Sequence, residues 1–170
     1  MSHIAFIGLG SNLEDPVGQL QQAFAELDGL PDTHLQARSS LYRSAPMGCP
    51  DMPDLTSQPD FINAVAKIAT GLSARDLLQS LLQVEHRHGR VRTFRNAPRT
   101  LDLDVLLYED MQLHEHGLTI PHPQMHRRAF VLQPLLEIAP DVVIPGIGNA
   151  ADSMKQCADQ QLQKVEHGGC

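Results

Sequence analysis

Two spacings of apolar residues alternate along the first 107 positions of the chain. Some segments are continuously apolar or alternate with period two, as strands do, and others repeat apolar residues every three or four positions, as one face of a helix does. The pattern predicts strands at 3–9, 35–42, 61–69 and 101–107 and helices at 17–27 and 74–82. The order strand, helix, strand, strand, helix, strand is typical of a ferredoxin-like split βαβ sandwich, an α+β fold.

Local signals refine the ends of these elements. Pro16 suits the first turn of a helix, and Ser73 with Asp76 resembles a capping box. The run Gly8-Leu9-Gly10 lacks the third glycine of a dinucleotide-binding fingerprint. We therefore interpret its glycines as a tight turn between the first strand and the first helix.

The remaining third of the chain adds elements to this sandwich. Its pattern predicts a turn and short strand within 109–120, a helix over 125–138 that Pro134 interrupts, and a polar helix over 150–165. A length of 170 residues predicts one domain, 1–170, of which 149–170 form a C-terminal helix and tail. The connection 43–60 is rich in proline, so it is either a flap that covers a substrate or a surface insertion.

Two carboxylates stand in the last of the four predicted strands. Side chains alternate in a strand, so Asp102 and Asp104 face one way, about 6–7 Å apart at their backbones. The opposite, core-facing side is predicted to hold Leu101, Leu103, Val105 and Leu107. Aspartate is depleted in strands and like charges on one face repel, which favours a site for two divalent cations over a merely solvated edge strand. Paired cations suit phosphoryl transfer.

Composition and charge narrow the class of partner. Hydrophobic residues make up 42% of the chain, and no apolar run approaches the roughly 18 residues of a membrane span. Three scattered cysteines and the lack of a signal-peptide pattern indicate a cytoplasmic protein. A net charge of −7 disfavours binding to nucleic acid or a membrane. Yet five of the thirteen basic residues cluster just before the aspartates, which suits a small polyanion: Arg87, Arg90, Arg92, Arg95 and Arg99.

Four histidines crowd one later segment: His114, His116, His122 and His126. A zinc site is the alternative chemistry here, but no cysteine joins them and their spacing matches no standard zinc motif. His122 lies between two prolines and shortly before Arg128, so we interpret it as a phosphate contact and the other three as solvated side chains.

With these residues in view, the segment 95–107 (RNAPRTLDLDVLL) closely resembles the signature of 6-hydroxymethyl-7,8-dihydropterin pyrophosphokinase, a family of folate biosynthesis. Flanking segments agree in order and spacing over roughly 4–145, among them GSNL at 10–13, PDFINA at 59–64, GRVR at 89–92 and TIPH at 119–122. The resemblance implies transfer of pyrophosphate from ATP to the hydroxymethyl group of the pterin, with release of AMP. The reaction would use two Mg²⁺ ions. The family resemblance also implies a monomer.

The resemblance also implies a role for individual residues. Asp102 and Asp104 would bind both Mg²⁺ ions, and Arg90 and Arg99 would stabilise the transition state. The ATP site would comprise Glu85, Arg90, Arg92, Arg99, Val105, Thr119, His122 and Arg128. The pterin site would comprise Ser44, Ala45, Met47, Phe61, Asn63, Asp102 and Phe130, with the two phenylalanines on either side of the ring.

The sequence departs from the family pattern at several positions. Asn96 stands where tryptophan is frequent, Leu82 replaces a residue that is usually polar, and Pro123 stands where an aromatic is common. Two other functions remain open beside the pterin one. They are a ferredoxin-like regulatory module that binds a cation structurally, and a transferase with the same ATP site that acts on another alcohol.

Overall fold

The computed structural model describes residues 3–11, 16–44, 61–87, 101–115, 117–123, 125–157 and 163–164. The predicted sandwich consists of β1 (His3–Ser11), α1 (Pro16–Asp28), β2 (Thr33–Arg38), β3 (Tyr42–Ser44), β4 (Phe61–Thr70), α2 (Ala74–Arg87) and β5 (Asp102–Tyr108). Ser73 caps α2, because its Oγ accepts a hydrogen bond from the Asp76 backbone N–H at 3.1 Å. None of the described helices is both long and apolar enough to cross a lipid bilayer.

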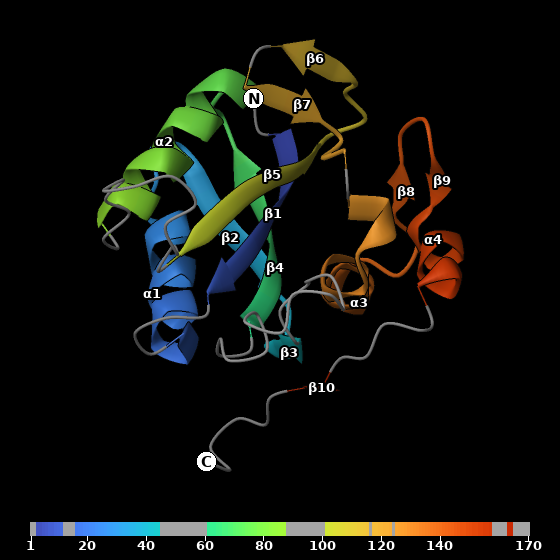
Figure 1. Cartoon of the computed structure of the whole chain (residues 1–170). Coiled ribbons are helices and arrows are strands. Elements are labelled where there is room, and N and C mark those ends of the chain that lie inside the picture. Colours follow the sequence, from blue (N-terminus) through green and yellow to red (C-terminus); the bar gives the residue numbers. More distant parts are fainter. Residues whose placement is uncertain are drawn as a thin grey trace.

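The main sheet is antiparallel throughout its described strands, in the order β10-β3-β4-β1-β5, where β10 is Gln163–Lys164, and β2 also pairs with β4 (Figure 1). Strand β4 thus lies between β1 and β2, which α1 connects. This is the split βαβ arrangement that the sequence predicts, so the α+β fold is confirmed.

The strand predicted at 35–42 divides into β2 and β3, which pair with different parts of β4. Ser39 lies between them, and its Oγ accepts a hydrogen bond from the Val65 backbone N–H at 2.9 Å. The Ser39 backbone N–H in turn donates to the Val65 carbonyl. A side-chain acceptor here replaces the backbone acceptor of a continuous strand, which ends the regular pairing.

The sheet has a hydrophobic core on each face. Helices α1 and α2 cover one face, where Leu20, Phe24, Leu77 and Leu81 pack against alternate residues of β1, β4 and β5 (Figure 1). The other face packs against η2 (Met125–Arg127), α3 (Ala129–Ile138), β8 (Val143–Ile144) and α4 (Ala150–Gln156). Strands β6 (Leu113–Glu115) and β7 (Leu118–Ile120) pair with each other and contribute Leu113, Leu118 and Ile120 to the first core, and β9 (Gly148–Asn149) pairs with β8.

Strand β5 changes the direction of its side chains partway along. The register with β1 shifts between Phe6 and Ile7, so that Leu106 is an extra residue between the partners of those two positions. Leu101, Leu103 and Val105 face the first core as predicted. The prediction for Leu107 is wrong, because the bulge turns it into the second core beside Phe6.

Two predictions for the C-terminal part are also wrong. Pro134 does not interrupt α3, which is continuous over Ala129–Ile138. Proline removes one backbone donor, and the burial of neighbouring Leu132 and Leu135 outweighs that loss. The helix expected over 150–165 ends at Gln156, and within that range β10 pairs with the outer edge of β3 instead.

Candidate functional site

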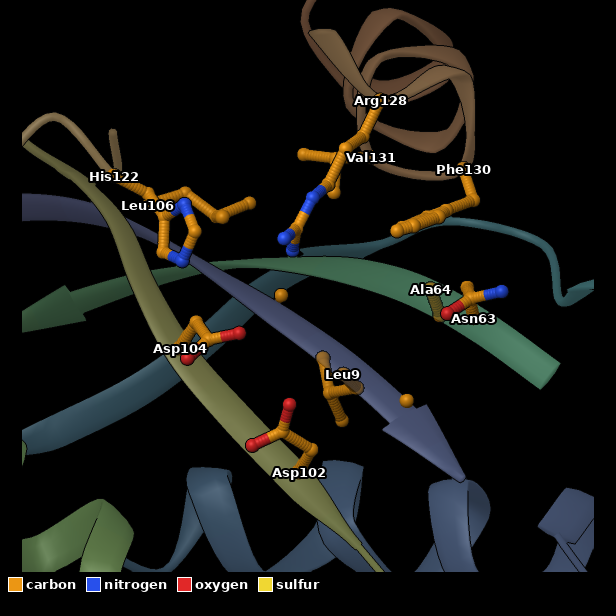
Figure 2. Close-up of a pocket in the computed structure, with 12 residues that line it drawn as sticks. Leu9, Asn63, Ala64, Asp102, Asp104, Leu106, His122, Arg128, Phe130 and Val131 are labelled. Carbon is orange, nitrogen blue, oxygen red and sulfur yellow. The ribbon is translucent and has the colours of Figure 1, made fainter. Parts of the chain in front are cut away.

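A cavity of about 280 Å³ opens on the sheet face that carries α3. Its floor comes from the sheet: Gly8 and Gly10 of β1, Asn63 of β4, and Asp102 and Asp104 of β5. Its opposite wall comes from the C-terminal elements: His122, Arg128, Phe130 and Val131. Figure 2 shows Arg128 and Phe130 pointing down toward the sheet and the two aspartates lying below them.

The hollow in the floor is due to glycine. Gly10 lies between Asn63 on one neighbouring strand and Asp102 on the other, and Gly8 lies between Val65 and Asp104. Neither glycine adds a side chain to this face. A Cβ at Gly10 would stand 3.1 Å from Asn63 Oδ1, closer than ordinary van der Waals contact. The earlier interpretation of these glycines as a strand-to-helix turn is wrong, since both lie inside β1.

Asp102 and Asp104 lie on the same face of β5, as predicted, and both are half-buried at the cavity floor. Among the described residues, no cluster of three or more His, Cys, Asp or Glu side chains could hold a metal ion. A pair of carboxylates fits Mg²⁺, which is often bound by one or two carboxylates and completes its shell with water and substrate phosphates. His116, one of the four clustered histidines, lies outside the described residues, so the zinc alternative stays untested.

His122 occupies the border of the cavity, and its backbone is tied to β5. Its N–H donates to the Leu106 carbonyl at 3.0 Å. Burial, aided by the positive charge of Arg128, lowers the pKa of His122 from its ordinary 6.5, although Asp102 opposes this. The imidazole is therefore neutral at pH 7 and can both donate and accept a hydrogen bond.

Arg128 and Phe130 stand at the start of α3 and interact with each other. The Arg128 Cζ atom lies 5.5 Å from the centroid of the Phe130 ring, within cation–π range. The contact places the planar guanidinium of Arg128 over one face of the Phe130 ring. The site therefore presents one group for an anion and one for a flat ring.

A second cavity of about 270 Å³ adjoins the first and shares Asp104 and His122 with it. It is lined in addition by Leu78, Val105, Leu118 and Thr119, among others. Val105 and Thr119, which the resemblance assigns to ATP, thus lie in one cavity, while Asn63 and Phe130, assigned to the pterin, lie in the other. Asp104 and His122 stand between the two.

Glu85, also assigned to ATP, lines neither of these two cavities. Its side chain is buried, and Oε2 accepts a hydrogen bond from the Leu103 backbone N–H at 2.7 Å. It lies beneath the aspartates, on the helix side of β5.

Several predicted site residues lie outside what the structure describes: Arg90, Arg92, Arg99, Ala45 and Met47. Ser44 and Phe61 are described through their backbones, which pair at the end of β3 and β4. Sequence reasoning missed the lining residues Gly8, Gly10, Leu106 and Val131. The period-two spacing of the glycines was a usable signal, since it places both on one face of a strand.

Residues 6–140 match the sequence model of the family described as 7,8-dihydro-6-hydroxymethylpterin-pyrophosphokinase (HPPK). A 2-amino-4-hydroxy-6-hydroxymethyldihydropteridine pyrophosphokinase of Haemophilus influenzae is 47% identical over 161 residues, covering 95% of this chain and 97% of that protein. One of the same name from Pseudomonas aeruginosa is 41% identical, covering 94% and 95%.

Solved structures agree on the fold. The wild-type HPPK-DHPS of Plasmodium falciparum with pteroate matches 92% of this chain with a TM-score of 0.71 at 12% sequence identity. The chain spans 44% of that larger protein. At this identity the likeness concerns the fold alone.

Proposed function

Because the chain belongs to the 7,8-dihydro-6-hydroxymethylpterin pyrophosphokinase family, we propose that the two adjoining cavities are where it transfers pyrophosphate from ATP to the pterin. The acceptor is the hydroxymethyl group of 6-hydroxymethyl-7,8-dihydropterin, and the reaction serves folate biosynthesis. The observation that carries the proposal is the position of Asp104 and His122, which line both cavities and so stand where the two substrates would meet.

The larger cavity is the proposed pterin site. Asn63 has a carboxamide that can donate and accept, which complements the mixed donors and acceptors of a pterin edge. Phe130 offers a ring face for stacking. We assign Phe61 to the other face of the pterin, and the segment at Ser44, Ala45 and Met47 to the end of this pocket.

The second cavity is the proposed nucleotide site, with Val105 and Thr119 beside the nucleoside. His122 and Arg128 would contact the phosphates, and we assign Arg90, Arg92 and Arg99 to them as well. Asp102 and Asp104 would hold two Mg²⁺ ions between the substrates. When bound, these ions would supply positive charge that offsets the negative charge developing on the phosphates.

The chemistry requires positioning more than covalent participation of the protein. The hydroxymethyl oxygen forms a bond to the β-phosphorus, the bond from that phosphorus to the α,β-bridging oxygen breaks, and AMP leaves. The hydroxymethyl proton is lost in the same process. Arg90 and Arg99 would stabilise the charge on the transferred group, as fixed cations do in a site from which water is excluded.

The test is AMP release after mixing the protein with ATP, Mg²⁺ and 6-hydroxymethyl-7,8-dihydropterin, with controls that lack pterin or metal. Asp102→Asn and Asp104→Asn should each lower turnover by about 10²–10³-fold or more while the fold persists, because each removes a charge from the metal site. Asp110→Asn is the matched control, since Asp110 is an exposed aspartate on a turn. Turnover in Asp102→Asn equal to that of Asp110→Asn would refute the metal assignment.

We further propose that residues 1–170 act as one domain and as a monomer on these small molecules, in the cytoplasm and without nucleic acid or membrane. Light scattering behind size-exclusion chromatography tests the monomer. A mass of twice 18.7 kDa would contradict it.

A further inference from the structure

A buried carboxylate lies directly behind the aspartate pair. Glu85 belongs to the apolar face of α2, where Leu77, Leu81 and Val84 are fully buried, and its own side chain is 1% exposed. Placing a carboxylate in such surroundings is unfavourable unless specific hydrogen bonds compensate. One of them is the 2.7 Å bond that Oε2 accepts from the Leu103 backbone N–H.

The position of that bond along the strand is what gives it a functional meaning. Leu103 lies between Asp102 and Asp104, and β5 is the last strand at its end of the sheet among the described residues. The Leu103 N–H is therefore held by α2 rather than by a neighbouring strand. Its side chain packs in the first core, while the flanking carboxylates face the cavity.

A second hydrogen bond fixes β5 on the far side of Asp104. The Leu106 carbonyl accepts from the His122 backbone N–H at 3.0 Å. Asp104 thus stands between two anchored backbone groups, one held by Glu85 and one by the segment that carries His122. Rotation of either peptide would change the direction in which the carboxylates point.

We propose that Glu85 is a positioning residue, which fixes the Leu103 peptide and thereby the relative orientation of the Asp102 and Asp104 carboxylates toward the metal ions. This rests on the proposed metal function of the aspartates. It differs from a direct contact with ATP, because Glu85 lines neither of the two cavities. It also predicts that the hydrogen-bond acceptor, rather than the charge, is what matters.

The experiment measures Mn²⁺ binding by electron paramagnetic resonance in the presence of α,β-methylene-ATP, so that no turnover is needed. Glu85→Met has no acceptor for the Leu103 N–H, and its Kd for Mn²⁺ should rise by about 10–100-fold, as when other outer-shell partners of metal ligands are lost. Glu85→Gln keeps a carbonyl acceptor and should bind Mn²⁺ as the wild type does. The Mg²⁺ concentration for half-maximal turnover should shift in the same order.

Val84→Ala is the matched control for destabilisation, because Val84 is the neighbouring fully buried position on the same helix. It should lower the melting temperature without changing the Kd for Mn²⁺. The proposal is overturned if Glu85→Met binds Mn²⁺ as Val84→Ala does, or if Glu85→Gln loses as much affinity as Glu85→Met. Asp104→Asn separates the metal-site hypothesis from the positioning hypothesis. Unchanged Mn²⁺ binding in Asp104→Asn refutes the metal site itself. Weaker Mn²⁺ binding in Asp104→Asn, together with unchanged binding in Glu85→Met, refutes only the positioning role.

Discussion

Alanine in place of Gly10 tests how the floor of the cavity orients the side-chain amide of Asn63, which we propose binds the pterin. The added Cβ would stand 3.1 Å from Asn63 Oδ1, and the backbone of Gly10 is not in the left-handed region, so alanine introduces no backbone strain. The contact must then be relieved by movement of the Asn63 carboxamide. Asn63 is 8% exposed, which leaves that side chain little room to shift without losing its alignment.

The expected effect follows from the hydrogen bonds that the amide would make to the pterin edge. A neutral hydrogen bond contributes about 0.5–1.5 kcal/mol, and one that is lost at the upper end of that range weakens binding about tenfold. We therefore expect the pterin Kd of Gly10→Ala to rise by about tenfold, with the nucleotide Kd unchanged. The measurement is calorimetric titration of 6-hydroxymethyl-7,8-dihydropterin in the presence of Mg²⁺ and α,β-methylene-ATP.

Gly8→Ala is the matched control, two residues along the same strand and on the same face. Its Cβ would approach Leu106 Cδ2 at 3.2 Å, a comparable distance, but the neighbour is the end of a flexible side chain. Leu106 can shift, so the pterin Kd should rise less than in Gly10→Ala. Equal effects of the two substitutions, or a loss confined to nucleotide binding in Gly10→Ala, would refute the reasoning.

Two further predictions concern titrating side chains. Tyr42 donates to Glu137 Oε1 at 2.8 Å, and burial together with Glu137 raises the pKa of Tyr42 to about 12. Tyr42→Phe should lower the free energy of unfolding by about 1–2 kcal/mol below pH 10. This difference should shrink between pH 10 and 12, where only the unfolded tyrosine ionises. Chemical denaturation of both proteins at several pH values measures the difference. A difference that stays constant with pH would contradict the raised pKa of Tyr42. Burial and Arg128 lower the pKa of His122, so the unfolded state binds more protons as the pH falls through 6.5. The stability of the wild type relative to His122→Asn should therefore decline from pH 7.5 to 5.5, and urea titrations that show no such decline would count against a lowered pKa.

The order of the sandwich elements could be predicted because each apolar stripe belongs to one face of one element. Leu77 and Leu81 repeat at helical spacing and Leu101, Leu103 and Val105 alternate, and both patterns hold in the structure. The prediction that Pro134 interrupts α3 and the prediction of a helix over 150–165 were wrong for a different reason. There the outcome depends on contacts between distant segments, namely the burial of α3 in the second core and the pairing of β10 with β3.

Local patterns likewise predicted some of the residues that line the cavity and missed others. The same-face position of Asp102 and Asp104 follows from strand geometry and could be predicted. The bulge that turns Leu107 away from the first core could not, because it depends on the register between β1 and β5. The hydrogen bond of Glu85 to the Leu103 N–H could not be predicted either. A glutamate on a helix is expected to face solvent or a ligand unless its partner on β5 is known.

The bulge in β5 gives the site its boundary. Before it, Asp102 and Asp104 face the cavity. At the bulge and just beyond it, Leu106 and Leu107 both enter the second core, which α3 covers. A strand with strict alternation would have placed only one of these two leucines there. The same strand thus carries the polar floor at one end and an anchor for the covering helix at the other. Arg128 and Phe130 project from the start of that helix, so the anchor fixes their distance from the aspartates. His122 lies at this border, where the core meets the polar floor, which accounts for the burial that lowers its pKa.

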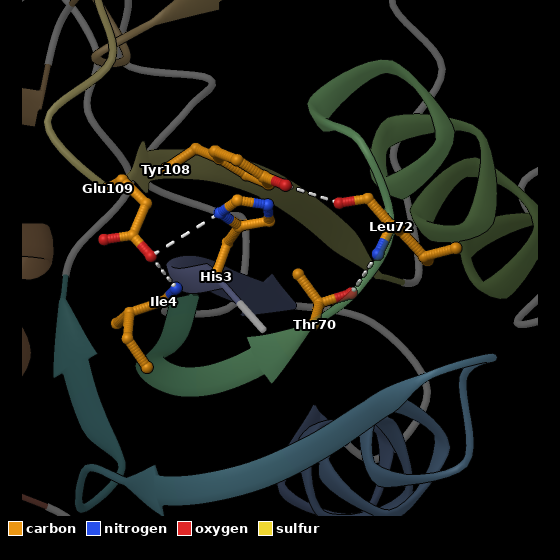
Figure 3. A network of polar contacts seen from close by, with 6 residues as sticks. All are labelled: His3, Ile4, Thr70, Leu72, Tyr108 and Glu109. Carbon is orange, nitrogen blue, oxygen red and sulfur yellow. Dashed lines mark hydrogen bonds and ion pairs between the residues drawn. The ribbon is translucent and has the colours of Figure 1, made fainter. Parts of the chain in front are cut away.

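A separate polar network fixes the far end of β1 and β5 (Figure 3). Glu109, just after β5, accepts a hydrogen bond from the Ile4 backbone N–H at 2.6 Å, and the Glu109 N–H donates to the Ile4 carbonyl. The Tyr108 hydroxyl donates to the Leu72 carbonyl, next to α2. The two Glu109–Ile4 bonds hold β1 and β5 together at the end opposite the cavity, beyond the bulge, and the Tyr108 bond joins that end of β5 to the segment before α2. The pairing beside the cavity, Gly8 with Asp104 and Gly10 with Asp102, continues from this end with the offset of one residue that the bulge introduces. The floor of the cavity therefore lies on a pair of strands whose other end is fixed by contacts outside the cavity.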